Sequence, residues 1–149
     1  MDTKKTLFIM QGIPGSGKST MAKLIADKHE AIIFSTDDFW YDYAEDGKHY
    51  TYNYDPARID EAHRWNQQRC AKEMIAEDGG NIVIDNTNIQ RWQAHPYLVL
   101  ASIFEYDVQV ISVQVPVEVA IARQAQRPVD RQIPEEVIRR MHSEMEVLL

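Results

Sequence analysis

The chain has 149 residues, of which 44% are apolar and 26% charged, with a formal net charge of −7 at pH 7. These values are ordinary for one globular domain and argue against a disordered or a membrane-spanning chain. The acidic balance also argues against a protein that holds a long nucleic acid on an overall basic face, because phosphate contacts need lysine and arginine.

The first predicted elements are a strand, a glycine-rich loop and a helix. An apolar run over residues 6–10 predicts a buried parallel strand, and helical spacing continues over residues 21–26. Between them, residues 12–19 read GIPGSGKS and fit G-x-x-x-x-G-K-[ST], the phosphate-binding loop of nucleoside triphosphatases. Glycine lets such a loop curl so that its N–H groups point at phosphate oxygens, and the helix adds its positive dipole end.

This loop predicts an ATP site. We expect Lys18 to reach the β- and γ-phosphates of ATP, and the Ser19 hydroxyl to complete the coordination of a Mg²⁺ ion that the phosphates hold. A glycine turn that binds nothing is the alternative, and the flanking strand and helix argue against it. The predicted ATP-binding residues are Gly12, Ile13, Pro14, Gly15, Ser16, Gly17, Lys18, Ser19 and Thr20.

Two carboxylates follow the second predicted strand. The apolar run over residues 31–35 ends just before Thr36, Asp37 and Asp38. Ligands of parallel α/β sheets bind at the carboxyl ends of the strands, so a general base for an attacking hydroxyl would lie here. The alternative roles for one of these carboxylates are a helix cap and a partner of a Mg²⁺-bound water.

An aromatic segment over residues 39–54 comes next. It holds half of the aromatic residues of the protein, and Gly47 marks a turn in the middle of what we expect to be a long loop. Rings at the mouth of a phosphate site suit stacking on a nucleic-acid base. Packing of the loop onto the body of the protein is an equal alternative for any single ring.

A long helix is predicted over residues 57–77, with Asp55 as its cap. It contains the single cysteine, Cys70, so no disulfide forms within the chain, which is typical of a reducing cytoplasm. Polar residues along one side of this helix either line the cleft or form a solvated edge. They are His63, Asn66 and Arg69.

The third predicted strand, residues 81–85, is apolar and ends in Asp85. A strand that ends in aspartate is typical of the second nucleotide-site motif, in which the carboxylate positions Mg²⁺ or its waters. Thr87 and Asn88 lie in the following turn and are suited to hydrogen-bonding an acceptor. A helix over residues 90–104, interrupted near a proline, then leads to a fourth strand.

The proline is Pro96, and the fourth strand is predicted over residues 108–113. Basic charge is concentrated after this strand, because five of the nine arginines fall in the last quarter of the chain. The pattern there is helix, short basic loop, helix. Arg123 and Arg127 are four residues apart, so on one helix they share a face and can close over a triphosphate.

Together these motifs resemble the P-loop kinases of the polynucleotide kinase family, over nearly the whole chain. The resemblance implies a three-layer α/β/α fold of the P-loop NTPase class, with a short parallel sheet of about four to five strands and a helical arginine lid. It also implies that Asp37 takes the proton of the acceptor hydroxyl and that Asp85 orients the acceptor or metal waters. Arg123 and Arg127 would form the lid, and the phosphate donor would be ATP.

One position departs from the family pattern. The phage kinases of this family carry an arginine for the acceptor phosphate two residues after the second aspartate, where this chain has Trp40. We therefore expect the acceptor to be held by a different set of residues, namely Asp38, Trp40, Thr87 and Asn88.

The sequence thus predicts an ATP- and Mg²⁺-dependent kinase, in one domain over residues 1–149, that phosphorylates a nucleic-acid hydroxyl. A polynucleotide 5′-hydroxyl, in DNA or RNA, is the first choice. The alternatives are a hydroxymethyl group on a modified DNA base, a small nucleoside-like alcohol, and a non-catalytic ATP-binding module. We expect no membrane partner and a cytoplasmic location, in a host cell if a phage encodes the chain, and make no prediction of oligomeric state.

Overall fold

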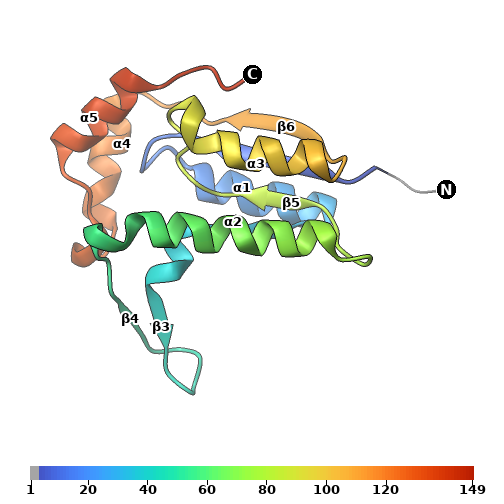
Figure 1. Ribbon diagram of the computed structural model, residues 1–149. Helices are drawn as coiled ribbons and strands as arrows, with labels where there is room; N and C mark the ends of the chain where they lie inside the picture. The colour runs from blue at the N-terminus through green and yellow to red at the C-terminus, as the bar shows by residue number, and fades with distance from the viewer. Residues whose placement is uncertain (1–3) are drawn as a thin grey trace.

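The structure, a computed structural model, describes residues 4–149 and is built on a parallel four-stranded sheet (Figure 1). The strand order is β2-β5-β1-β6, so β1 lies between two neighbours. The strands are β1 (Thr6–Gln11), β2 (Ile32–Phe34), β5 (Ile82–Ile84) and β6 (Asp107–Ser112). The predicted α/β class with a short parallel sheet is confirmed.

Helices cover both faces of this sheet because the side chains of β1 alternate between the two faces. Phe8 and Met10 pack against α1 on one face, whereas Leu7 and Ile9 pack against α2 and α3 on the other. The result is three layers (Figure 1). The helices are α1 (Lys18–His29), α2 (Ile59–Ile75), α3 (Arg91–Ile103), α4 (Val117–Arg123) and α5 (Glu135–Glu144).

A small antiparallel hairpin stands away from the sheet, below α2 in Figure 1. It consists of β3 (Tyr41–Tyr43) and β4 (Tyr50–Tyr52), and the 3-10 turn Thr36–Trp40 joins it to β2. The prediction of a long loop over residues 39–54 is therefore wrong. The turn between β3 and β4 contains Gly47, whose φ of 68° is a conformation that glycine adopts easily.

Helix α3 runs without a break through Pro96, so the predicted interruption is wrong. Proline removes one backbone hydrogen bond. The buried residues Ala94, Tyr97 and Ala101 hold the helix on the sheet on both sides of that position. Packing therefore outweighs the local preference of proline.

Helices α4 and α5 lie together at the end of the sheet where the strands terminate (Figure 1). Ala120 and Ile138 from these helices pack on Ile13 of the glycine loop. The last helix of this pair is followed by a tail that returns to the sheet, where the Glu146 N–H donates to the Ile89 carbonyl oxygen. Helices α4 and α5, where the lid was predicted, thus share a small core with the glycine loop.

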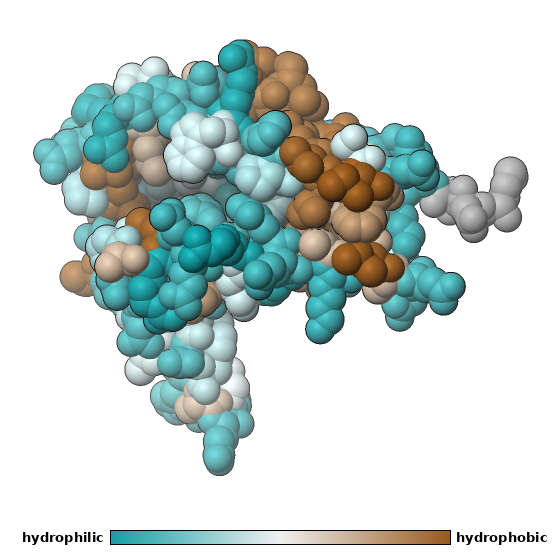
Figure 2. All heavy atoms as spheres, in the orientation of Figure 1, coloured by the Kyte–Doolittle hydropathy of each residue, from teal (hydrophilic) through white to brown (hydrophobic). Residues whose placement is uncertain are grey.

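The hydropathy of the surface differs from one end of the molecule to the other. On the face drawn in Figure 2, apolar side chains gather at the ends of α2 and α3 that lie away from α4 and α5, where Ile75 and Ile103 are exposed. The hairpin end is mostly polar. Within residues 4–149, no helix combines the length and apolar character needed to cross a bilayer.

Candidate active site

The glycine loop connects β1 to α1, and its backbone takes a conformation that glycine adopts more easily than other residues. Gly15 and Gly17 have φ values of 89° and 90°, in the left-handed region. A Cβ on Gly15 would lie 2.5 Å from the Ala120 carbonyl oxygen, so the close approach of α4 also requires glycine. Helix α1 then begins at Lys18, with Ser19 and Thr20 in its first turn, where backbone N–H groups have no partner within the helix and can bind an anion.

Lys18 and Asp85 form an ion pair next to this loop. Lys18 Nζ lies 2.8 Å from Asp85 Oδ1, and the two side chains are only 12% and 10% exposed. Asp85 follows β5 directly, and β5 is the neighbour of β1 in the sheet, so sheet topology brings the two motifs together. In the sequence the two residues belong to separate motifs, and in the structure their side chains are in contact.

Asp37 lies on the 3-10 turn after β2 and accepts a hydrogen bond from the hairpin. The Tyr52 hydroxyl donates to Asp37 Oδ1 at 2.7 Å. Burial, followed by this hydrogen bond to Asp37, raises the pKa of Tyr52 well above its usual value, so the phenol remains a donor. The turn itself is held by Asn86, whose Oδ1 accepts from the Thr36 N–H at 2.9 Å.

Asp38 is held from the other side by α2. Arg69 donates to Asp38 Oδ2 at 3.2 Å and to the Ser35 carbonyl oxygen at 3.0 Å. The same guanidinium stacks on Trp65 at 3.9 Å from the ring centroid. Arg69 thus anchors the acidic turn, Thr36–Trp40, to α2. It neither lines the cleft nor forms a solvated edge, but supports the turn from the side of α2.

The lid arginines are placed differently from one another. Arg123 is the last residue of α4 and donates to the Gly15 carbonyl oxygen at 2.9 Å. Arg127 lies beyond the helix in extended backbone, with φ −89° and ψ 153°. The prediction that both share one helical face is therefore wrong, because Arg127 precedes Pro128 and proline disfavours helical backbone in the residue before it.

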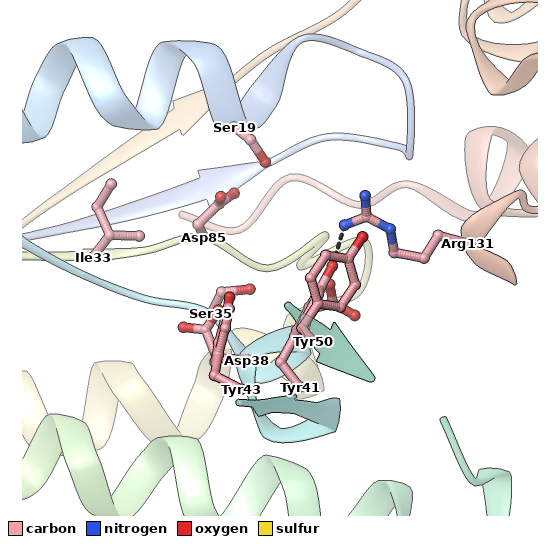
Figure 3. Close-up of a pocket in the computed structure, with 10 residues that line it drawn as sticks. Ser19, Ile33, Ser35, Asp38, Tyr41, Tyr43, Tyr50, Asp85 and Arg131 are labelled. Carbon is pink, nitrogen blue, oxygen red and sulfur yellow. Dashed lines mark hydrogen bonds between the residues drawn. The ribbon is translucent and has the colours of Figure 1, made fainter. Parts of the chain in front are cut away.

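A cleft of about 520 Å³ brings the acidic turn, the glycine loop and the hairpin together (Figure 3). Ser19, Asp37 and Asp85 all line it, so the predicted metal-binding and base residues share one cavity. Arg131, from the segment after α4, reaches in from the opposite side in Figure 3 and donates to the Tyr41 hydroxyl. The other lining residues are Ile33, Ser35, Asp38, Tyr41, Tyr43 and Tyr50.

Three of the four predicted acceptor-binding residues do not line this cleft. Trp40 is only 6% exposed and packs between Phe39 and Tyr54. Asn88 is 1% exposed, and its side-chain amide donates to the Met10 carbonyl oxygen at 2.7 Å. Thr87 contributes its carbonyl oxygen, which accepts from the Gly12 N–H at 3.0 Å. Thr87 and Asn88 thus support the glycine loop and β1, Trp40 packs among aromatic rings, and Asp38 alone of the four lines the cleft.

The residues present fit a magnesium ion that phosphate groups also hold. Within residues 4–149, no group of three or more His, Cys, Asp and Glu side chains is arranged to hold a metal by itself. Ser19 and Asp85 supply a hydroxyl and a carboxylate, the oxygen donors that Mg²⁺ prefers, on the phosphate side of the cleft. Such a sparse protein set is typical of magnesium bound together with a nucleotide.

Two residues, one that lines the cleft and one that contacts Asp37, had no assigned role in the sequence. Arg131 was one member of a basic loop, and Tyr52 was one ring of the aromatic segment. The pattern YDY followed by YTY around Gly47 carries the alternation of a hairpin, and this signal could have placed Tyr52 beside Tyr41. No sequence signal places Arg131 opposite the hairpin, because that contact joins segments 90 residues apart.

Comparison with known proteins gives a family and a fold. A family model described as AAA domain matches residues 7–148. Human NEDD4-binding protein 2 is 40% identical over 103 residues, which are 68% of this chain and 5% of that protein. The chain therefore spans only a small part of the length of this curated relative.

Two solved structures share the architecture of this chain. The structure of the Pnkp1/Rnl/Hen1 RNA repair complex matches with a TM-score of 0.72 and 20% identity, over 97% of this chain and 45% of the other. A gluconokinase from Sinorhizobium meliloti 1021 matches with a TM-score of 0.61 and 13% identity, over 98% of this chain and 78% of the other. At these identities the likeness establishes a P-loop kinase-like fold.

Proposed function

The chain belongs to the AAA domain family, and from its P-loop kinase-like fold we propose that it is an ATP-dependent phosphotransferase. The acceptor we assign is a hydroxyl of a nucleic acid, with a polynucleotide 5′-hydroxyl as the first choice. The observation that carries this proposal is the shared cleft, in which Ser19, Asp85 and Asp37 line one cavity. A phosphate site and a carboxylate base are then close enough to serve a single reaction.

The chemistry is an in-line displacement at the γ-phosphorus of ATP. The acceptor hydroxyl gives its proton to Asp37, and its oxygen forms a bond to the γ-phosphorus. The bond from that phosphorus to the bridging oxygen breaks, and ADP leaves. Lys18 and Arg123, beside the loop, offset the negative charge of the phosphates. Magnesium, held by Ser19 and Asp85, would supply further charge neutralisation and orient the phosphates.

The hairpin side of the cleft supports a nucleic-acid acceptor. Tyr41, Tyr43 and Tyr50 line it with aromatic rings, and any nucleic-acid base can stack on such a ring. Arg131 is the only basic residue among the lining residues, within residues 4–149, and it offers a cation to a phosphate next to the acceptor hydroxyl. A hydroxymethyl group on a flipped base would use the same rings.

A small-molecule alcohol is the second candidate acceptor. Three aspartates, Asp37, Asp38 and Asp85, line the cleft against a single arginine, and the whole chain carries a net charge of −7. Such a potential favours a neutral acceptor over a polyanion. The gluconokinase with the same fold is an example of a kinase for a small alcohol.

Replacement of the proposed base tests the assignment. We expect Asp37→Asn to bind ATP as tightly as the wild type in calorimetry, and to lose at least about 1,000-fold in transfer from labelled ATP to a 5′-hydroxyl oligonucleotide. Asp42→Asn is the matched control, because Asp42 is exposed on β3 and does not line the cleft. An Asp37→Asn protein with the activity of the wild type would contradict the assignment.

A further inference from the structure

The hairpin carries four tyrosines on one face. Antiparallel pairing sets Tyr41 opposite Tyr52 and Tyr43 opposite Tyr50, and residues two apart on a strand share a face. The rings of Tyr41 and Tyr52 lie 5.0 Å apart, and those of Tyr41 and Tyr43 are stacked with 15° between their planes. Tyr41, Tyr43 and Tyr50 line the cleft, whereas Tyr52 is not among the lining residues.

The fourth tyrosine makes the hydrogen bond to the base. The Tyr52 hydroxyl donates to Oδ1 of Asp37 at 2.7 Å, across a chain separation of 15 residues. A hydrogen bond from a hydroxyl to a carboxylate is short and directional, so it holds the carboxylate in one orientation. Because Oδ1 is occupied, Oδ2 is the oxygen that remains to receive a proton.

The same hairpin also contacts the segment after α4. Arg131 donates to the Tyr41 hydroxyl, and its guanidinium carbon lies 5.6 Å from the centre of that ring. Arg131, Tyr41, Tyr52 and Asp37 therefore form a continuous row from the lid side of the cleft to the base.

We propose that Tyr52 is a positioning residue, which orients Asp37 through its hydroxyl and couples the orientation of the base to the hairpin that receives the acceptor. This inference rests on the proposed function. An acceptor that stacks on Tyr41, Tyr43 and Tyr50 holds the hairpin in place, and the hairpin in turn holds Tyr52 against Asp37. In the reaction Tyr52 transfers no proton, and the acceptor proton moves to Oδ2 of Asp37.

The test is Tyr52→Phe, which removes the hydroxyl and keeps the ring against Tyr41. We expect kcat to fall roughly tenfold, with the KM for ATP unchanged. A tyrosine that only supports the packing of the hairpin would change the KM for the acceptor or the stability of the protein rather than kcat alone.

Tyr54→Phe is the matched control, because it removes a hydroxyl from the next exposed ring, which packs on Trp40 outside the cleft lining. Equal kinetics for wild type and Tyr52→Phe, or an equal fall in both variants, would overturn the inference. Two further findings separate it from the proposed function. Absence of transfer by the wild type contradicts the proposed function, whereas wild-type transfer that depends on Asp37 and not on Tyr52 contradicts the inference alone.

Discussion

At the scale of single residues, the Lys18–Asp85 ion pair explains how the two phosphate-site motifs are held before any phosphate binds. Each side chain is about nine-tenths buried, and each neutralises the other across 2.8 Å. A triphosphate with magnesium offers both of them new partners of opposite charge. Under the proposed function, the pair keeps two buried charges paired at a position where ATP and magnesium would give each charge a new partner.

This ion pair predicts an asymmetry in stability. We expect Asp85→Ala to lower the free energy of unfolding by about 2 kcal/mol, because it leaves the Lys18 ammonium largely buried and unpaired. Asp107→Ala is the control: it breaks the Lys4–Asp107 pair, whose side chains are 60% and 56% exposed, and should cost less than about 1 kcal/mol. Urea unfolding of the two variants measures both values, and equal losses would contradict this reading of the pair.

The path of the glycine loop was predictable from sequence because motif spacing reflects local backbone geometry. Lys18 and Ser19 follow the loop by chain connectivity alone. Trp40 and Asn88 were assigned to the acceptor because polar or aromatic residues near a strand end suit binding, but burial decides their positions. Asn88 satisfies a backbone carbonyl inside the fold. Long-range packing of this kind leaves no local signal in one sequence.

At the scale of elements, the helices and the four sheet strands follow from apolar periodicity, and the hairpin and the lid show where it fails. The strands β3 and β4 have three residues each and carry few aliphatic side chains, so the apolar signal of a strand is weak. In the segment after α4, the four-residue spacing of Arg123 and Arg127 predicted one helical face. That prediction failed because Pro128 disfavours helical backbone at Arg127. Both errors concern the elements that surround the acceptor side of the cleft.

Helix α2 carries a group whose titration affects stability. Burial lowers the pKa of His63 below its ordinary value of 6.5, and Asp60 only partly offsets this effect. The unfolded chain then binds a proton at a higher pH than the folded protein does. The contribution of neutral His63 to the free energy of unfolding is therefore fully present above about pH 6.5, and it is lost as the pH drops toward the pKa of the folded state.

We expect His63→Gln to lose less stability than the wild type between pH 7 and pH 5, because it lacks this proton uptake on unfolding. Urea unfolding at each pH gives the comparison. A wild type and a His63→Gln variant with parallel pH dependence would show that the histidine is not the cause.

At the scale of the whole molecule, the site lies where three layers end. The sheet places the glycine loop, the acidic turn and Asp85 at one edge, because parallel strands present their carboxyl ends together. The lid and the hairpin then close this edge from two sides (Figure 1). Charge divides along the same lines, with three aspartates in the cleft and Arg123 and Arg131 brought in from the lid side.

The central claim is that the protein transfers the γ-phosphoryl group of ATP to a nucleic-acid hydroxyl. The most direct measurement is transfer from γ-labelled ATP to a panel of acceptors, with Lys18→Ala as the inactive control. The panel holds 5′-hydroxyl DNA and RNA, single-stranded and duplex, hydroxymethylated DNA with blocked ends, and free nucleosides and sugars. We expect label on 5′ ends, lost in Lys18→Ala. Label on nucleosides or sugars alone would contradict the nucleic-acid acceptor, and no label on any acceptor would contradict the phosphotransferase itself.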